Sequence, residues 1–254
     1  MNGFAHPPTG STGPLISLVR EIHDVLLPRG CAGCDRPDER ICSSCRRGFS
    51  LCMARRMPES LFSAGCVYAC GEYRGSVRRA ILQWKDHGDE EITGDLCFAL
   101  ERCVHESGVG RKLSRYDHVL VVPVPSSPTS MRSRGRRHTL PLAVSVARCL
   151  TAQGVRAEAD SILSITGVRS KSVQQRGAVE RSARLADHIM VRPRLIPDGG
   201  NAHQMHPVVL VDDIATTGST LRQCAKTLRE AHLPVITAFV LAQVPDAVRS
   251  SSVM

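Results

Sequence analysis

The fold is decided by residues 208–220, which read VVLVDDIATTGST. The four apolar residues 208–211 form a short continuous run, which is typical of a strand buried on both faces. Asp212 and Asp213 follow at the expected end of this strand, and a small hydroxylated turn containing Gly218 comes next. Helical spacing of apolar residues then predicts a helix over Leu221–Ala231. A strand, a tight turn and a helix in this order predict one unit of an α/β domain.

The same alternation extends over the second half of the chain. A strand is expected at Val119–Val124, a helix at Leu140–Leu150, a closing strand at Val235–Leu241, and weaker strands at Ile162–Ile165 and Ile189–Val191. Alternating strands and helices favour a parallel sheet with crossover connections. The elements expected upstream are a helix, a strand and two more helices, at Leu15–Leu27, Ala64–Ala69, Ser76–Lys85 and Glu90–His105.

The turn after the 208–211 strand has the chemistry of a phosphate site. Its backbone N–H groups and hydroxyls lie at the positive end of the next helix, which attracts anions, and Gly218 lets the backbone approach a phosphate closely. Two carboxylates would repel a phosphate, so Asp212 and Asp213 require a ligand that also carries hydroxyls. A ribose 5-phosphate has both features. A purely structural helix cap would explain Ser219 but not the two aspartates.

Three other phosphate-binding patterns fit less well. An apolar run followed by two aspartates is also typical of a Walker B strand, but the chain has no Gly-x-x-x-x-Gly-Lys-Ser/Thr loop. A response-regulator receiver begins in the same way, but only about forty residues follow Asp213. A dinucleotide-binding fold lacks its Gly-x-Gly-x-x-Gly motif.

A second motif consists of two Cys-x-x-Cys pairs between residues 31 and 45. Each pair forms a tight knuckle with both sulfurs on one side, so four thiolates can surround one tetrahedral ion, and the closed site indicates structural zinc. The candidate ligands are Cys31, Cys34, Cys42 and Cys45. The alternatives are a redox dithiol or an iron–sulfur site, or Cys52 in place of Cys45 with a looser knuckle. Most of the remaining cysteines are interpreted as small core residues in a reducing compartment.

The net charge of +9 is concentrated in clusters, which suit an anionic partner such as nucleic acid or a polyphosphate, or else form a solvated arginine-rich surface. The clusters are Arg132, Arg134, Arg136 and Arg137, and Arg169, Lys171, Arg176, Arg181 and Arg184.

The longest apolar runs are too short to span a bilayer, and residues 1–12 lack the basic and apolar regions of a secretory signal. We therefore expect a cytoplasmic protein without a membrane partner.

Residues 208–220 resemble the phosphoribosyl pyrophosphate signature of type I phosphoribosyltransferases. Val122-Pro-Val-Pro125, Arg134-Gly135, the basic segment with Gln175 and the four-cysteine motif resemble the ComF branch of that family, over roughly residues 28–244. The resemblance implies a type I phosphoribosyltransferase-like parallel sheet flanked by helices, with a small N-terminal zinc-ribbon-like module. The implied division is a tail and helix (1–27), the zinc module (28–56), the phosphoribosyltransferase-like domain (60–244) and a C-terminal tail (245–254).

The resemblance also implies roles for individual residues. The two aspartates would bind the ribose hydroxyls and the following turn the 5-phosphate of phosphoribosyl pyrophosphate, with magnesium at the pyrophosphate. The implied binding residues are Asp212, Asp213, Ala215, Thr216, Thr217, Gly218, Ser219 and Thr220. The implied pyrophosphate loop is Arg134, Gly135, Arg136 and Arg137, because the arginine fork binds phosphate oxygens bidentately. ComF sequences commonly have Phe-Asn where this chain has Arg136-Arg137.

Two further elements complete the implied site. A mobile basic loop would close over it and exclude water. The loop residues are Arg169, Lys171, Gln175 and Arg176. Lys85 matches a family position that reaches the cleft, although a surface lysine lying along Trp84 explains it equally well.

Two functions follow from the resemblance. One is a transferase that moves a phosphoribosyl group and releases pyrophosphate, with an unidentified acceptor and no evident general base. The other is a non-catalytic protein that senses phosphoribosyl pyrophosphate, or that binds single-stranded DNA beside the DNA-uptake machinery. Basic residues around the cysteines favour DNA, although Phe49 is the sole aromatic residue there for base stacking. These residues are Arg29, Arg36, Arg40, Arg46, Arg47, Arg55 and Arg56.

Overall fold

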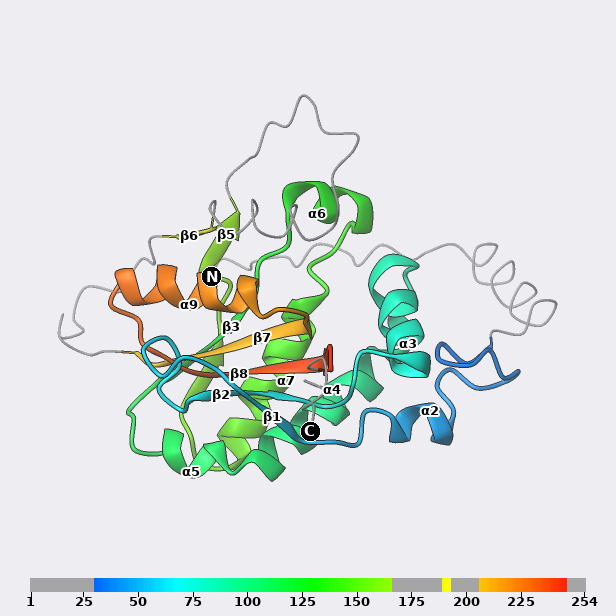
Figure 1. Cartoon of the computed structure of the whole chain (residues 1–254), viewed down its shortest axis with the longest axis horizontal. Coiled ribbons are helices and arrows are strands. Elements are labelled where there is room, and N and C mark those ends of the chain that lie inside the picture. Colours follow the sequence, from blue (N-terminus) through cyan, green and yellow to red (C-terminus); the bar gives the residue numbers. More distant parts are fainter. Residues whose placement is uncertain (1–29, 166–188, 193–205, 246–254) are drawn as a thin grey trace, which may run out of the picture.

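A computed structural model describes residues 30–165, 189–192 and 206–245. Strands and helices alternate along most of this length (Figure 1). In chain order the elements are α2 (Ser43–Arg47), β1 (Met53–Arg56), β2 (Cys66–Ala69), α3 (Gly75–Asp86), the 3-10 helix η1 (Glu90–Ile92), α4 (Thr93–Ser107), α5 (Val109–Leu113), β3 (Val119–Pro123), α6 (Pro128–Arg134), α7 (Thr139–Ala152), β4 (Ala157–Ala159), β5 (Leu163–Ile165), β6 (Ile189–Val191), β7 (Val208–Ala215), α9 (Ser219–Glu230) and β8 (Val235–Gln243).

The main sheet has six strands in the order β1-β2-β8-β7-β3-β4. β1 runs antiparallel to β2, and every other neighbouring pair is parallel. All five residues of β3 and all nine residues of β8 are buried. Parallel strands of this kind are covered on both faces. The expected fold class, an α/β protein whose mostly parallel sheet is flanked by helices, is confirmed.

Two clusters of buried side chains cover the two faces of the sheet. One contains the apolar faces of α3, α4 and α7, together with Cys31, Cys42 and Cys45 of the cysteine motif. The other contains the apolar face of α9 and residues of β5 and β6. The cysteine loop therefore shares its core with α3, while α9 lies on the opposite side of the sheet (Figure 1).

The structure differs from the sequence expectations at three strands. β7 does not end before the aspartates but continues through them to Ala215, because its backbone pairing with β8 continues to Ala215–Gln243 and does not depend on side-chain polarity. The weak strands at 163–165 and 189–191 lie outside the main sheet and form a separate antiparallel pair. The helix expected at 15–27 lies outside the described residues. No helix within the described ranges is long and apolar enough to cross a membrane.

Candidate functional site

The carboxylates of β7 are held by neighbours from two other segments. Asp213 is 4% exposed, and its Oδ2 atom lies 2.7 Å from Nε2 of His138 and also pairs with the ammonium group of Lys85. Oδ1 of Asp212 accepts a hydrogen bond of 2.8 Å from the backbone N–H of Asp213. Apart from the hydrogen bond between the two carboxyl groups themselves, no further side chain of the described residues donates a hydrogen bond to either aspartate. One acceptor oxygen on each aspartate therefore remains for a ligand.

The two aspartates have opposite pKa shifts. Burial acts to raise the pKa of Asp213, but the charge of Lys85 and the hydrogen bond with His138 hold it below its usual range. Burial, and then the negative charge of Asp213, raise the pKa of Asp212 to about 8. Burial acts to lower the pKa of Lys85, but the charges of Asp213 and Asp212 raise it above its usual value. Near neutral pH the site thus combines a fixed carboxylate with one that titrates.

Lys85 reaches the site because α3 ends beside it. The preceding residue, Trp84, is fully buried and its indole N–H donates to Oγ1 of Thr93 at 2.9 Å, which fixes the last turn of the helix. Its ring meets the His138 ring edge-on, with 5.3 Å between centroids. His138 was not predicted from the sequence. Its partner Asp213 is 75 residues away, and no local spacing marks such a contact.

The predicted pyrophosphate-loop arginines are divided between two environments. Arg134 lies 2.9 Å from Asp86, and Arg136 lies 3.0 Å from Glu90 with its guanidinium over the Trp84 ring. These two arginines attach the loop to the end of α3. Gly135 has a φ of 66° and caps the C-terminus of α6, a position that favours glycine.

Arg137 has a different position from its neighbours. It is exposed and lines a cavity of about 260 Å³ at the carboxyl end of β3. Residues 166–188 lie outside the described residues, so the predicted loop residues Arg169, Lys171, Gln175 and Arg176 stay a prediction.

The predicted phosphate turn lies at the start of α9. Gly218 caps the helix with a φ of 74°, a left-handed conformation that a side chain would strain. Thr216 and Thr217 are exposed, and Oγ1 of Thr217 accepts from the backbone N–H of Ser219 at 3.3 Å. The Thr217 hydroxyl also bonds the Ser219 hydroxyl at 3.0 Å. A helix N-terminus with exposed hydroxyls beside it is suited to an anion.

Two arginines that the sequence did not assign to this turn bind its carbonyls; Arg55 was grouped with the basic residues around the cysteines. Arg55 donates to the Thr216 carbonyl at 2.6 Å, and Arg222 donates to the Thr217 carbonyl at 2.9 Å. They come from β1 and α9, so the turn is held from both sides and carries added positive charge.

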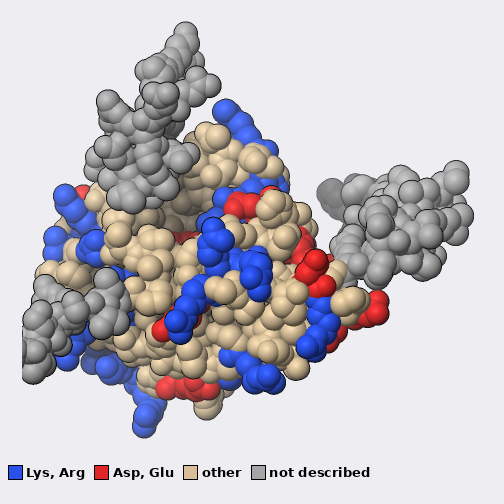
Figure 2. Space-filling view, turned by 45° about the vertical axis from the view of Figure 1, so that its right-hand side comes forward, with Lys and Arg blue, Asp and Glu red and all other residues tan. Residues whose placement is uncertain are grey.

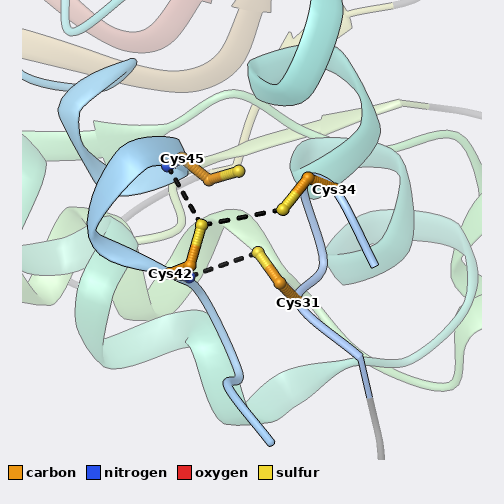
Figure 3. Close-up of side chains that lie close together, drawn as sticks. All are labelled: Cys31, Cys34, Cys42 and Cys45. Atoms are coloured by element: carbon orange, nitrogen blue, oxygen red, sulfur yellow. Dashed lines mark hydrogen bonds between the residues drawn. The ribbon is translucent and has the colours of Figure 1, made fainter. Parts of the chain in front are cut away.

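The four cysteines of the paired motif converge on one point (Figure 3). Their Sγ atoms all lie within 4.8 Å of one another, and those of Cys34 and Cys42 are 3.6 Å apart. A zinc–sulfur tetrahedron with bonds of about 2.3 Å has edges of about 3.8 Å, so the group can hold a metal such as zinc. The Sγ atom of Cys52 lies 3.6 Å from that of Cys103 instead, and Cys52 is not part of the group.

The thiol of Cys31 is prepared for a metal by its backbone surroundings. Burial acts to raise its pKa, but hydrogen bonds from the backbone N–H groups of Cys42, Gly33 and Cys34 lower it to about 6. The hydrogen bond from Cys42 N–H is 3.2 Å long and is drawn in Figure 3. Such donors stabilise a thiolate, which is the form that binds metal.

The face shown in Figure 2 does not single out a nucleic-acid site. On the face shown in Figure 2, basic side chains of the described residues form several separate groups with acidic side chains between them. A continuous basic stripe, the usual electrostatic footprint of a nucleic-acid-binding surface, is not visible on the described part of this face. The acidic end of β7 and the cysteine loop are candidate sites because their side chains converge.

Comparison with known proteins returns phosphoribosyltransferases as structural neighbours, while no family model and no curated protein matches the chain. An orotate phosphoribosyltransferase from Aeropyrum pernix is 20% identical, with 65% of this chain and 63% of that chain covered and a TM-score of 0.28. The hypoxanthine-guanine enzyme of L. donovani is 13% identical, with 64% and 93% covered and a TM-score of 0.33. An adenine phosphoribosyltransferase is 9% identical, with 80% and 90% covered and a TM-score of 0.35. The functional argument therefore rests on the site.

Proposed function

We propose that the chain binds phosphoribosyl pyrophosphate with magnesium at the acidic end of β7 and transfers its phosphoribosyl group to an acceptor. The observation that carries this proposal is the pair of acceptor oxygens left on Asp212 and Asp213 beside the N-terminus of α9. The two neighbouring hydroxyls of a ribose need two acceptors, and its 5-phosphate needs an anion site close by. The resemblance of residues 208–220 to the family signature supports the same ligand.

The residues around the aspartates have roles that follow from charge. Lys85 and His138 keep Asp213 ionised, so its free oxygen accepts a hydrogen bond from a ribose hydroxyl. Asp212 supplies the second acceptor, and residues 215–220 bind the 5-phosphate. Bond breaking leaves positive charge on the ribose, which the ionised carboxylate of Asp213 would stabilise electrostatically.

Magnesium would be held at the free oxygen of the ionised Asp213, which has lone pairs for both the ion and a ribose hydroxyl, because this ion keeps several waters and is commonly held by one or two carboxylates together with substrate phosphates. When bound, it supplies positive charge against the phosphates of the leaving group. The segment Arg134–Arg137 supplies further positive charge. Arg134 and Arg136 can bind the phosphates only after they leave their partners Asp86 and Glu90. These two acidic side chains are 40% and 64% exposed, so water can solvate them once the arginines have moved.

The proposal is tested by calorimetric titration of phosphoribosyl pyrophosphate with magnesium. We expect Asp212→Asn to weaken binding more than about tenfold, or ~1.4 kcal/mol. This variant leaves the pair of Lys85 and Asp213 intact, whereas Asp213→Asn also disturbs it, so a melting curve accompanies each. Glu230→Gln, exposed at the far end of α9, is the matched control. Unchanged affinity in folded Asp212→Asn protein would refute the ribose site.

Transfer is distinguished from binding by measuring pyrophosphate release in the same titrations. Binding without release of pyrophosphate for any acceptor would favour the alternative, a protein that senses phosphoribosyl pyrophosphate.

The resemblance to the ComF branch extends the proposal to a two-part protein that acts in DNA uptake in the cytoplasm. Its two parts would be a zinc module and a phosphoribosyltransferase-like domain. Its single-stranded-DNA contact rests on the arginines around the cysteines alone.

A further inference from the structure

The predicted phosphate turn is held by two arginines to which the proposed function gives no role. Arg55 of β1 donates to the Thr216 carbonyl at 2.6 Å. Arg222 of α9 donates to the Thr217 carbonyl at 2.9 Å. The two elements are far apart in the sequence, yet their arginines reach consecutive carbonyls of one turn. The positions of both peptide units are therefore fixed from outside the turn.

Each of these hydrogen bonds also fixes the direction of a backbone N–H group. A trans peptide unit is planar, so its N–H points away from its own C=O, and both units here are trans. The Thr216 carbonyl shares a peptide unit with the Thr217 N–H, and the Thr217 carbonyl shares the next one with the Gly218 N–H. Arg55 therefore turns the Thr217 N–H away from its guanidinium group. Arg222 does the same for the Gly218 N–H.

These two N–H groups are available to a ligand. Neither donates to an acceptor among the described residues, whereas the next N–H along the chain, that of Ser219, donates to Oγ1 of Thr217. Gly218 caps the N-terminus of α9, so both groups lie at the positive end of this helix. Aligned peptide dipoles at such an end stabilise an anion, and unpaired N–H groups there are its usual donors.

The charge of the arginines also strengthens these donors. A cation at a carbonyl oxygen draws electron density along the peptide unit, which makes the N–H at the other end more positive. Hydrogen bonds linked in a chain polarise one another in this way, by about 10–30% per bond. Each arginine can therefore increase the attraction of the turn for a phosphate without contact with the phosphate itself.

We propose that Arg55 and Arg222 are positioning residues for the 5-phosphate of the sugar, and that they act through the N–H groups of Thr217 and Gly218. This inference rests on the proposed function, because it needs a sugar phosphate at this turn. It assigns one N–H to each arginine. Arg55 orients and polarises that of Thr217, and Arg222 that of Gly218.

Direct binding of the phosphate by the arginines is the other role open to them. An arginine that moved to the phosphate would exchange one hydrogen bond for another and would leave its peptide unit free to rotate. An arginine that stays on the carbonyl keeps its own bond while the N–H donates to the phosphate. The observed contacts therefore favour the indirect role.

The first test is calorimetric titration of ribose 5-phosphate into the full chain, with a melting curve for every variant. We expect Arg55→Met and Arg222→Met each to weaken binding about tenfold, the loss of one hydrogen bond to a charged group. Arg222→Lys keeps a cationic donor and should recover part of the loss. Arg229→Met is the matched control, because Arg229 is on the same helix and donates at 2.9 Å to a carbonyl outside the turn, that of Ser60. It should leave the affinity unchanged.

The second test separates the indirect role from direct contact and from a merely structural one. Amide hydrogen exchange is measured by NMR with ribose 5-phosphate bound. In wild type, both N–H groups should be protected. Arg55→Met should lose protection at Thr217 and keep it at Gly218, while Arg222→Met should show the reverse. Direct contact predicts protection at both positions in both variants, and a merely structural role predicts a lower melting temperature with both positions affected alike.

Three results would overturn the inference. These are unchanged affinity in folded Arg55→Met and Arg222→Met protein, weaker affinity with both N–H groups protected or both affected alike, and an equal loss of affinity in Arg229→Met. Wild-type protein that binds neither ribose 5-phosphate nor phosphoribosyl pyrophosphate overturns the proposed function and this inference with it. Binding of phosphoribosyl pyrophosphate that Asp212→Asn weakens and neither arginine affects overturns the positioning role alone.

Discussion

The cysteine loop and the acidic end of β7 each collect groups that become negatively charged and repel one another. In the loop, four sulfurs lie within 4.8 Å of one another (Figure 3), and among the described residues their hydrogen bonds come from one another and from backbone N–H groups rather than from a basic side chain. At the end of β7, two neighbouring carboxylates are accompanied by Lys85 and His138 of the same chain. The loop thus needs an external cation to neutralise its thiolates, whereas at the strand end the side chains of Lys85 and His138 neutralise the carboxylates.

This difference has a consequence for folding. A site that carries its own counter-charge is assembled before any ligand arrives, while a site built from thiolates gains its stability when the metal binds. The helix α3 connects the two. Arg79, near its start, donates to the Gly33 carbonyl at 2.6 Å, and Lys85, near its end, pairs with Asp213.

The largest expected effect is metal dependence of the cysteine loop. We expect one zinc per chain, measured by elemental analysis of protein prepared without added metal. Structural zinc supplies about 10–16 kcal/mol of apparent binding energy in small modules, so chelation should unfold the loop and expose it to proteolysis. Cys34→Ser should lose the metal because it removes one of the four ligands. Since Cys34 is exposed, the change should cost little packing energy. Cys149→Ser, which lies outside the cluster, is the control and should keep the zinc. Less than about half an equivalent of zinc in the wild-type protein would contradict the assignment.

The second effect concerns the internal counter-charge. Lys85→Met should lower the free energy of unfolding by about 3–5 kcal/mol, because it leaves the buried carboxylate of Asp213 without its ammonium partner. Urea denaturation measures this. Arg78→Met, an exposed residue on the same helix, is the control and should change stability by less than about 0.5 kcal/mol. Equal stability of the two variants would show that Lys85 is not needed at the strand end.

The third effect concerns pH. Because the pKa of Asp212 rises from 3.8 to about 8 in the folded protein, the folded state holds this proton more tightly than the unfolded chain. The contribution of Asp212 to the free energy of unfolding therefore falls as pH rises from about 4 to about 8. Asp212→Asn should match wild type near pH 4 and exceed it at pH 9 by at least about 1.4 kcal/mol, one pKa unit. Urea denaturation at several pH values measures the free energy of unfolding of both proteins. If the two free energies changed with pH in the same way, Asp212 would not be a buried, titrating group.

The smallest effect tests the link through α3. Arg79→Gln removes the hydrogen bond to the Gly33 carbonyl and should cost about 1 kcal/mol without releasing zinc. In wild type, chelation should increase amide hydrogen exchange in the last turn of α3, and in Arg79→Gln this response should be smaller. Arg78→Gln is the control. An equal response in both variants would show that the two regions are independent.

The sequence predicted the elements that have a strong local pattern. The helix at 76–85 and the strands at 119–124 and 235–241 are found within two residues of their expected bounds, because their apolar periodicity is decided locally. The short elements α2, β1, α5, α6 and β4 were not predicted. They have three to seven residues each, and pairing or packing stabilises them more than periodicity does.

Residues 208–220 and the paired cysteines by themselves determined the α/β class, the candidate phosphate turn and the metal-binding motif, because each depends on residues close together in the chain. Only the tertiary structure brought His138 and Lys85 to Asp213, and placed Arg137 apart from Arg134 and Arg136. These contacts join residues dozens of positions apart, and local spacing carries no record of them. The charge state of the acidic pair is decided by such contacts, since burial and the distance to a neighbouring charge set a pKa.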